Sequence, residues 1–444
     1  MLSKNSKAFS LNRQILNLSV PNIITNITVP LVGMVDIALM GHLADPAYIG
    51  AIALGSMVFN LLYSGVIFLR MGTSGFTAQA FGALNRKEIS AILFRSLIVA
   101  QLIAFFLIAL QSPIEWLGFE LINANSDVES LAISYFRIRI WAAPATLGVY
   151  AFTGWFLGMQ NAKYPMFVAL IINVVNIITS VYFVRVGGMK SDGVALGTLI
   201  AQYSGLIASV VFYYFAFRKK LSRISINDIL NIKALKLFFR VNTDILIRSL
   251  LIAATFFYFN SVSAGLGNDI LAINAVMLQF FMFFSYFVDG FAFAAEAIVG
   301  KYLGAKNLKM LKASVSRLMI WGLMLAITFT AVYFIGYRLI VNLLTDNESL
   351  IMIIMDYKIW VVLIPLVSFS AFIWDGIFTG ATASSYMRNN MIIAVLLVFI
   401  PARYILVPLY DNHGLWLALL LFLLARGVGL WISYGRGQVT GFRV

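Results

Sequence analysis

Twelve stretches of about 20 or more mostly apolar residues follow one another along the chain, separated by short polar segments. A helix of about 20 apolar residues crosses the hydrocarbon core of a bilayer. Within that core, only helices and closed barrels satisfy all their backbone hydrogen bonds, and barrel strands need only about 9–11 residues. The sequence therefore predicts an all-α integral membrane protein with twelve transmembrane helices.

The predicted spans form two halves of six, joined by short connections. They cover residues 15–41, 50–80, 89–111, 131–159, 164–186 and 193–217, and then 238–264, 270–299, 314–336, 354–381, 390–409 and 413–435. The longest connections, 112–130 and 218–237, are too short for a separate domain. We expect an N-terminal six-helix lobe at 1–217, a cytoplasmic linker at 218–237 and a C-terminal six-helix lobe at 238–444.

Composition excludes several classes of protein. The chain is 61% hydrophobic and 11% charged, against about 45–50% and about 25% in soluble domains. It has no cysteine and two histidines, which excludes disulfides and leaves little for a metal site or a catalytic triad. No G-x-x-x-x-G-K-[ST] phosphate loop occurs. We therefore expect no enzyme activity, no metal and no other cofactor, and any uphill transport must use an ion gradient.

The net charge is +14, and the Lys and Arg residues are divided unequally between the two predicted sides of the membrane. On the side of the predicted N-terminus and the even-to-odd loops we count 21 Lys and Arg, and about four on the other side, namely Arg185, Lys190, Arg338 and Arg403. Because Lys and Arg collect in cytoplasmic loops, both termini are predicted to be cytoplasmic. The partner that this charge predicts is the lipid bilayer, and we expect no nucleic-acid binding.

The two halves share an internal repeat at a constant offset, equal to half the length of the chain. The matched positions are Gly82-Ala83-x-Asn85 with Gly304-Ala305-x-Asn307, Gly154 with Gly376, Gly158 with Gly380, and Tyr164 with Tyr386. Since each repeat has an even number of spans, the lobes are expected to be related by a pseudo-two-fold axis along the membrane normal. A cleft between the lobes would then be the substrate path, and a monomer could suffice.

Asp36 is the acid placed well within the first six spans, where a charged group costs about 2.5–3.5 kcal/mol on insertion scales. At 100° per residue, Asn22 and Thr25 lie within about 60° of it on the same helix face. Pro21 and Pro30 favour bending of this helix. A carboxyl group in a low-dielectric, hydrogen-bonded pocket can exchange a proton reversibly, although it could instead serve only to hold helices together.

Spans five and six carry further polar faces that we expect to converge on this carboxyl group. Their members lie three or four residues apart, which places them on one side of each helix. They are Asn173, Asn176 and Ser180 in span five, and Thr198 and Gln202 in span six.

The second half carries a different set of ionisable residues within its spans. Asp289 and Glu296 lie two turns apart on one face of span eight, and Asp375 lies in span ten. Arg248, near Asp244 in span seven, could pair with Glu296 or Asp375, either as a gate or as a static structural pair. Arg70 and Arg426 receive no role.

These residues resemble those of the multidrug and toxic compound extrusion (MATE) family, particularly its DinF branch. The resemblance lies in PNIITNITVPLVGMVDIALMGHL (21–43), TAQAFGALN (77–85), GVALGTLIAQ (193–202), DGFAFAAEAIVGKYLGAKN (289–307) and DGIFTGA (375–381). It implies two six-helix lobes, a prokaryotic inner membrane, and efflux of organic, often cationic compounds in exchange for H⁺ or Na⁺. The family's coupling-ion aspartate falls on Asp36, its supporting positions on Asn176 and Thr198, and its helix bend on Pro21.

One departure from the family concerns the ion. Some members carry a second acid four residues after the span-five asparagine, where this chain has Ser180. A single carboxyl group suits one proton better than a dehydrated Na⁺, which prefers several oxygen ligands. We expect proton-coupled efflux by alternating access. Na⁺ coupling, a flippase for lipid-linked precursors and, less favoured, a membrane-embedded enzyme are the alternatives.

Overall fold

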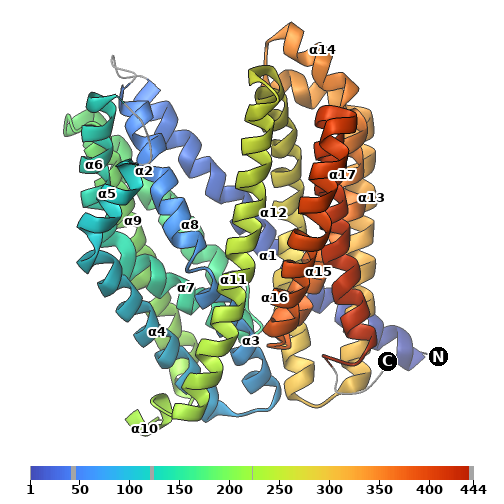
Figure 1. The fold of residues 1–444 in the computed structure, drawn as a ribbon. Helices are drawn as coiled ribbons and strands as arrows, with labels where there is room; N and C mark the ends of the chain where they lie inside the picture. The colour runs from blue at the N-terminus through green and yellow to red at the C-terminus, as the bar shows by residue number, and fades with distance from the viewer. Residues whose placement is uncertain (1, 42–46, 121–124, 223, 440–444) are drawn as a thin grey trace. The chain divides into compact units, whose positions relative to one another are not determined.

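The computed structural model describes residues 2–41, 47–120, 125–222 and 224–439, and the regular structure in these ranges is helical (Figure 1). The first ten α-helices are α1 (Leu2–Gly41), α2 (Ala47–Ser64), α3 (Phe68–Gly82), α4 (Arg86–Ala109), α5 (Gln111–Glu120), α6 (Ser126–Arg139), α7 (Ala143–Gly158), α8 (Lys163–Val181), α9 (Ser191–Phe212) and α10 (Ile226–Ile229). They are followed by α11 (Ile232–Gly265), α12 (Asn268–Gly304), α13 (Leu308–Leu344), α14 (Glu348–Asp356), α15 (Lys358–Gly380), α16 (Ser384–Ile393) and α17 (Ile400–Gly435).

Eleven continuous helical segments in the described part of the chain are long and apolar enough to cross a membrane, and the last contains two crossings. That segment, Ser384–Gly435, has 52 residues, about 78 Å of helix at 1.5 Å per residue against a hydrocarbon core of about 30 Å. Its helix is broken at Asp411, where φ is 47° and ψ is −127°. The backbone of Gly414 approaches the carbonyl oxygen of Leu406 closely. Two crossings here give the twelve predicted spans.

Helix ends and helix contacts repeat at the predicted offset of half the chain. Asn85 and Asn307 each cap a helix, accepting from the backbone N–H three residues later at 3.0 and 3.1 Å. Each is preceded by a residue in the left-handed region, with φ of 56° at Leu84 and 53° at Lys306. The caps and the turns before them are therefore the same in both halves.

Helix packing follows the same offset. Gly154 of α7 lies against the backbone carbonyl of Arg70 in α3, and Gly376 of α15 lies against that of Ala292 in α12. The two carbonyl-bearing residues are separated by the same half-chain offset as the glycines themselves. Small residues allow such close backbone approach between membrane helices.

The close contact at Gly376 predicts a cost for a single added methyl group. In Gly376→Ala the new Cβ meets the carbonyl of Ala292, so the helices must separate, and we expect a loss of about 1–3 kcal/mol. Gly336→Ala is the matched control, because its Cβ meets only Ile340 Cδ1, at 3.7 Å. Thermal unfolding midpoints in detergent measure both; equal midpoints would contradict the close packing.

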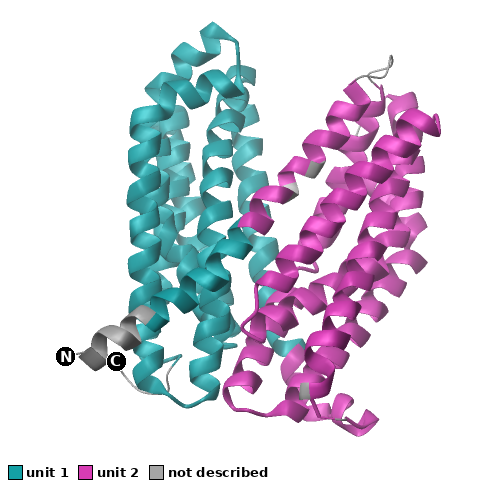
Figure 2. Ribbon diagram, turned by 180° about the vertical axis from the view of Figure 1, so that it is seen from behind, with its two compact units in different colours: residues 1–23, 239–444 teal, residues 24–238 magenta. Residues whose placement is uncertain are grey.

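The helices form two compact units (Figure 2). Unit 1 contains residues 1–23 and 239–444, and unit 2 contains residues 24–238. Unit 1 includes the first part of α1, and unit 2 includes the segment predicted as a linker. Within unit 1, Asn12 Oδ1 accepts from Trp321 Nε1 at 3.3 Å. Within unit 2, the predicted linker packs onto α4, since Arg95 donates to the carbonyls of Asp228 and Ile229 at 3.1 Å.

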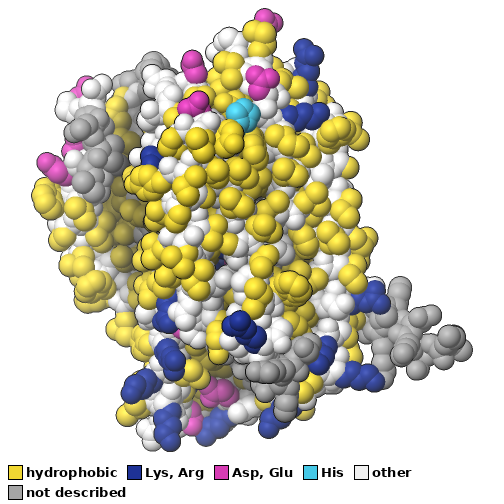
Figure 3. Space-filling view, turned by 45° about the vertical axis from the view of Figure 1, so that its right-hand side comes forward, with side chains coloured by type: hydrophobic (Ala, Val, Ile, Leu, Met, Phe, Trp, Pro, Cys, Tyr) yellow, Lys and Arg dark blue, Asp and Glu magenta, His cyan; other side chains and the backbone are white. Residues whose placement is uncertain are grey.

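The surface carries an apolar band bounded by charge. Figure 3 shows hydrophobic side chains over most of one face, with Lys and Arg gathered mainly at one end. The predicted charge count needs one correction: it omitted Arg137, an exposed residue that pairs with Glu115 at 2.8 Å, and Lys358 at the start of α15. Adding Arg137 and Lys358 raises the number of Lys and Arg on the side opposite the N-terminus from about four to about six. This is still far below the 21 on the side of the N-terminus.

Candidate functional site

Asp36 lies in the α1 portion of unit 2 and is 8% exposed. Its neighbours Val35 and Leu39 pack in an apolar cluster with Phe59 of α2 and Tyr135 of α6. Oδ1 of Asp36 is buried and has no hydrogen-bond partner among the residues that the structure describes. A negative charge on this carboxyl group is costly in such surroundings, and protonation removes that cost.

Arg139, at the end of α6, is the cation whose electrostatic field acts on Asp36. Its Nη1 donates to Tyr135 Oη at 2.7 Å and to Ser56 Oγ at 3.1 Å. Its guanidinium also lies 4.7 Å from the centre of the Phe59 ring. Hydroxyl acceptors and an aromatic face from α2 and α6 thus hold the guanidinium in place.

The predicted polar faces of spans five and six meet where α8 packs on α9. Asn176 Nδ2 donates to Thr198 Oγ1 at 3.0 Å, and Asn173 Nδ2 donates to the carbonyl of Thr28 at 3.2 Å. Ser180 is fully buried against the backbone of Gly197. The absence of a side chain at Gly197 allows this close approach between α8 and α9.

The other predicted members of this pocket lie on α1 and α9. Asn22 belongs to unit 1, where its Nδ2 donates to the carbonyl of Leu18 at 2.8 Å. Thr25 and Gln202 are partly exposed residues of unit 2. Pro21 lies inside α1, which remains helical from Leu2 to Gly41, so the bend at Pro21 stays a prediction.

Unit 1 holds a buried cluster of charges at Asp375. Oδ2 of Asp375 accepts from Arg248 of α11 and, at 2.7 Å, from Arg426 of α17. The exposed fractions are 6% for Asp375, 7% for Arg248 and 3% for Arg426. Of the two predicted partners of Arg248, the one joined to it by an ion pair is Asp375. One carboxylate oxygen is thus shared by two guanidinium groups, in charge-assisted hydrogen bonds.

The other predicted acids of the second half lie on α11 and α12. Asp289 acts electrostatically on Arg426, whereas Glu296 is 1% exposed on the same helix, α12. Asp244, one turn before Arg248, accepts from Ser384 at 2.9 Å and pairs with Arg388. Asp375 and Asp244 therefore join α11 to α15, α16 and α17.

Sequence reasoning missed two of these cations. Arg426 received no role, and Arg139 was not considered, although each lies well inside a predicted span. The available signal was depth: a cation eight or more residues inside an apolar span needs a partner, because its insertion is costly. That signal marks the residue but does not identify its partner.

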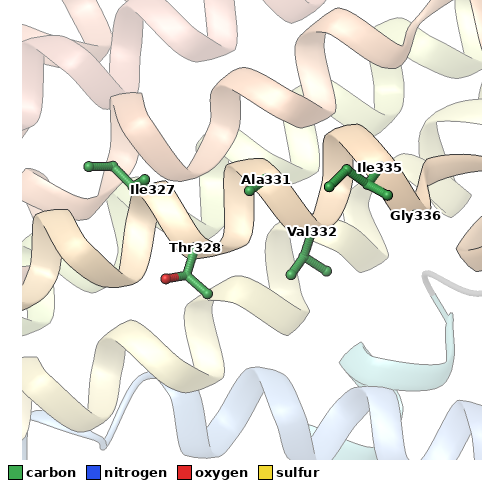
Figure 4. A pocket seen from close by; sticks show the side chains of 6 residues that line it. All are labelled: Ile327, Thr328, Ala331, Val332, Ile335 and Gly336. Carbon is green, nitrogen blue, oxygen red and sulfur yellow. The ribbon is translucent and has the colours of Figure 1, made fainter.

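An apolar groove of about 600 Å³ follows the surface of α13 (Figure 4). It is lined by Ile327, Thr328, Ala331, Val332, Ile335 and Gly336. The one hydroxyl among them, on Thr328, donates within its own helix to the carbonyl of Met324 at 2.9 Å. The groove brings no charged group to a ligand, and it is not part of the candidate coupling site.

The family model and the relatives that match this chain indicate the same family. The model of the MatE family matches residues 21–182 and 245–405, together more than half of the chain. The chain is 35% identical over 431 residues to DNA damage-inducible protein F of Escherichia coli K12, covering 95% of this chain and 91% of that protein. It is 22% identical over 433 residues to the probable multidrug resistance protein NorM of Thermotoga maritima, covering 94% and 90%.

The fold is also similar to that of solved structures. The MATE transporter VcmN of Vibrio cholerae superposes with a TM-score of 0.86 at 18% sequence identity, covering 97% of this chain and 98% of that one. At this level of identity the likeness concerns the fold alone.

Proposed function

This chain belongs to the MATE family of membrane transporters, and we propose that it exports amphiphilic organic compounds in exchange for protons. The family makes it a transporter and not an enzyme, with twelve transmembrane helices in two lobes. The similarity to DNA damage-inducible protein F agrees with the predicted DinF branch. The multidrug resistance proteins among its relatives support small organic compounds as substrates.

The proposal of proton coupling depends on one observation, the burial and hydrogen bonding of the Asp36 carboxyl group. It is buried, one oxygen has no hydrogen-bond partner among the described residues, and it lies in unit 2. Asp375, the buried acid at the centre of the unit 1 cluster, is already bonded to two guanidinium groups. Asp36 is therefore the better site for reversible protonation.

The proposed transport cycle depends on the two protonation states of one carboxyl group, that of Asp36. Protonation of Asp36 neutralises a buried charge, and loss of the proton restores it, so the two forms favour different packing of α1. Movement of one lobe against the other would then alternate access to the substrate. We also propose that both termini are cytoplasmic, following the charge bias, and that the membrane is the inner membrane, following the charge bias and the family. A monomer could suffice, since one chain supplies both lobes.

The test is substrate flux in proteoliposomes made with purified protein. We expect an imposed pH gradient, without Na⁺, to drive transport of a fluorescent organic cation at least tenfold above protein-free vesicles. A Na⁺ gradient at equal pH on both sides should drive none. Transport that requires Na⁺ would overturn proton coupling, whereas lipid movement without solute flux, in a headgroup-accessibility assay, would favour the flippase.

A further inference from the structure

Arg139 lies in the same unit as the candidate coupling carboxyl group and is held by side chains of α2 and α6. Arg139 and Tyr135 lie one turn apart on α6, and Ser56 and Phe59 lie one turn apart on α2. All four are in unit 2 with Asp36. Two helices therefore present a guanidinium, two hydroxyl groups and an aromatic ring to one place.

The guanidinium already uses two oxygen atoms that could otherwise bind a metal cation. Ser56 Oγ and Tyr135 Oη both accept from Arg139 Nη1, at 3.1 and 2.7 Å. An alkali cation in a protein requires several oxygen ligands, whereas a proton needs one oxygen. The guanidinium therefore withdraws Ser56 Oγ and Tyr135 Oη from any metal cation at this site.

The charge of Arg139 acts in the same direction. Its guanidinium lies over the Phe59 ring and donates to Tyr135, and both rings belong to the apolar cluster that contains Val35 and Leu39, on either side of Asp36 in the sequence. A Na⁺ ion at Asp36 would bring another full charge next to this fixed cation. A proton instead forms a covalent O–H bond and leaves a neutral carboxyl group, with the guanidinium as the one remaining charge of the pair.

We propose that Arg139 excludes Na⁺ from the Asp36 site and thereby determines that the proton is the coupling ion. This rests on the proposed function, since it takes Asp36 as the coupling residue. Arg139 is a specificity-determining residue: it supplies a fixed positive charge and occupies two oxygen acceptors that a metal cation could use.

The test compares Arg139→Gln with Arg139→Lys and with Arg137→Gln. The Gln variant removes the charge and frees Ser56 and Tyr135. Lys keeps the charge. Arg137 lies two residues away, with a side chain that is 65% exposed and paired with Glu115, and it serves as the matched control.

We expect Arg139→Gln to gain at least a tenfold stimulation of organic-cation transport by a Na⁺ gradient at fixed pH. Wild type, Arg139→Lys and Arg137→Gln should show none. Purified Arg139→Gln should also bind radioactive ²²Na⁺, and adding Asp36→Asn should remove this binding. The binding assay keeps the proposal testable if the Gln variant folds but does not transport.

Each outcome separates this inference from the proposed function. Arg139→Gln protein that neither responds to Na⁺ nor binds ²²Na⁺, alongside proton-driven wild type, overturns the role of Arg139 alone. Na⁺-driven transport by wild type overturns proton coupling itself. Na⁺ binding that survives Asp36→Asn places the ion elsewhere and also overturns the inference.

Discussion

Asp36→Asn is expected to retain substrate binding and to lose proton-driven efflux by at least 100-fold in proteoliposomes. Asparagine has nearly the same shape as protonated aspartic acid, so packing against Val35, Leu39 and their partners is preserved. It cannot release a proton at any working pH, so the carboxylate form of the cycle is lost. Fluorescent-cation flux under a pH gradient and equilibrium binding of the same cation measure the two effects separately.

Asp192→Asn is the matched control for this variant. Asp192 is also an acid of unit 2, but it lies in the first turn of α9 and accepts from Ser134 at 2.8 Å. We expect transport by the Asp192→Asn variant to remain within about twofold of wild type. Substitutions of exposed or partly exposed residues away from the site have small effects. Wild-type transport by Asp36→Asn would make Asp36 a structural residue and direct the search for the coupling site to Asp289 or Glu296.

Asp375→Asn is expected to destabilise the protein by about 3–5 kcal/mol, because it leaves two buried guanidinium groups without their shared carboxylate. Both guanidinium groups are nearly inaccessible, with side-chain exposures of 9% for Arg248 and 4% for Arg426. Water cannot readily replace the lost acceptor. Thermal unfolding in detergent, compared with the exposed-site control Asp356→Asn, measures the effect.

A second variant distinguishes a structural cluster from a gate. Replacing all three members by apolar residues, as Asp375→Leu with Arg248→Met and Arg426→Met, removes the charges together and should recover most of the stability. If the cluster is only structural, transport recovers with stability. A triple variant that is stable but transports at a changed rate would support the gate, and an Asp375→Asn protein as stable as wild type would contradict the pairing.

The helices and the repeat were predictable because they depend on local pattern. Apolar length predicted the crossings, and the half-chain offset paired Gly154 with Gly376 and Asn85 with Asn307, positions that make equivalent contacts in the structure. The predicted linker shows the limit of that approach. Its polar composition gave no sign that Asp228 would accept from Arg95, since that contact joins residues 133 positions apart.

For the candidate site, too, the sequence predicted some features and the tertiary structure decided the others. The sequence by itself determined that Asp36 is an acid inside an apolar helix, because one charge among apolar residues is visible without any partner. Only the tertiary structure placed Arg139 with Ser56 and Tyr135, and made Arg426 the second partner of Asp375. Helical periodicity orients a side chain about its own axis. Which helices meet depends on the packing of the whole lobe, which no local pattern records.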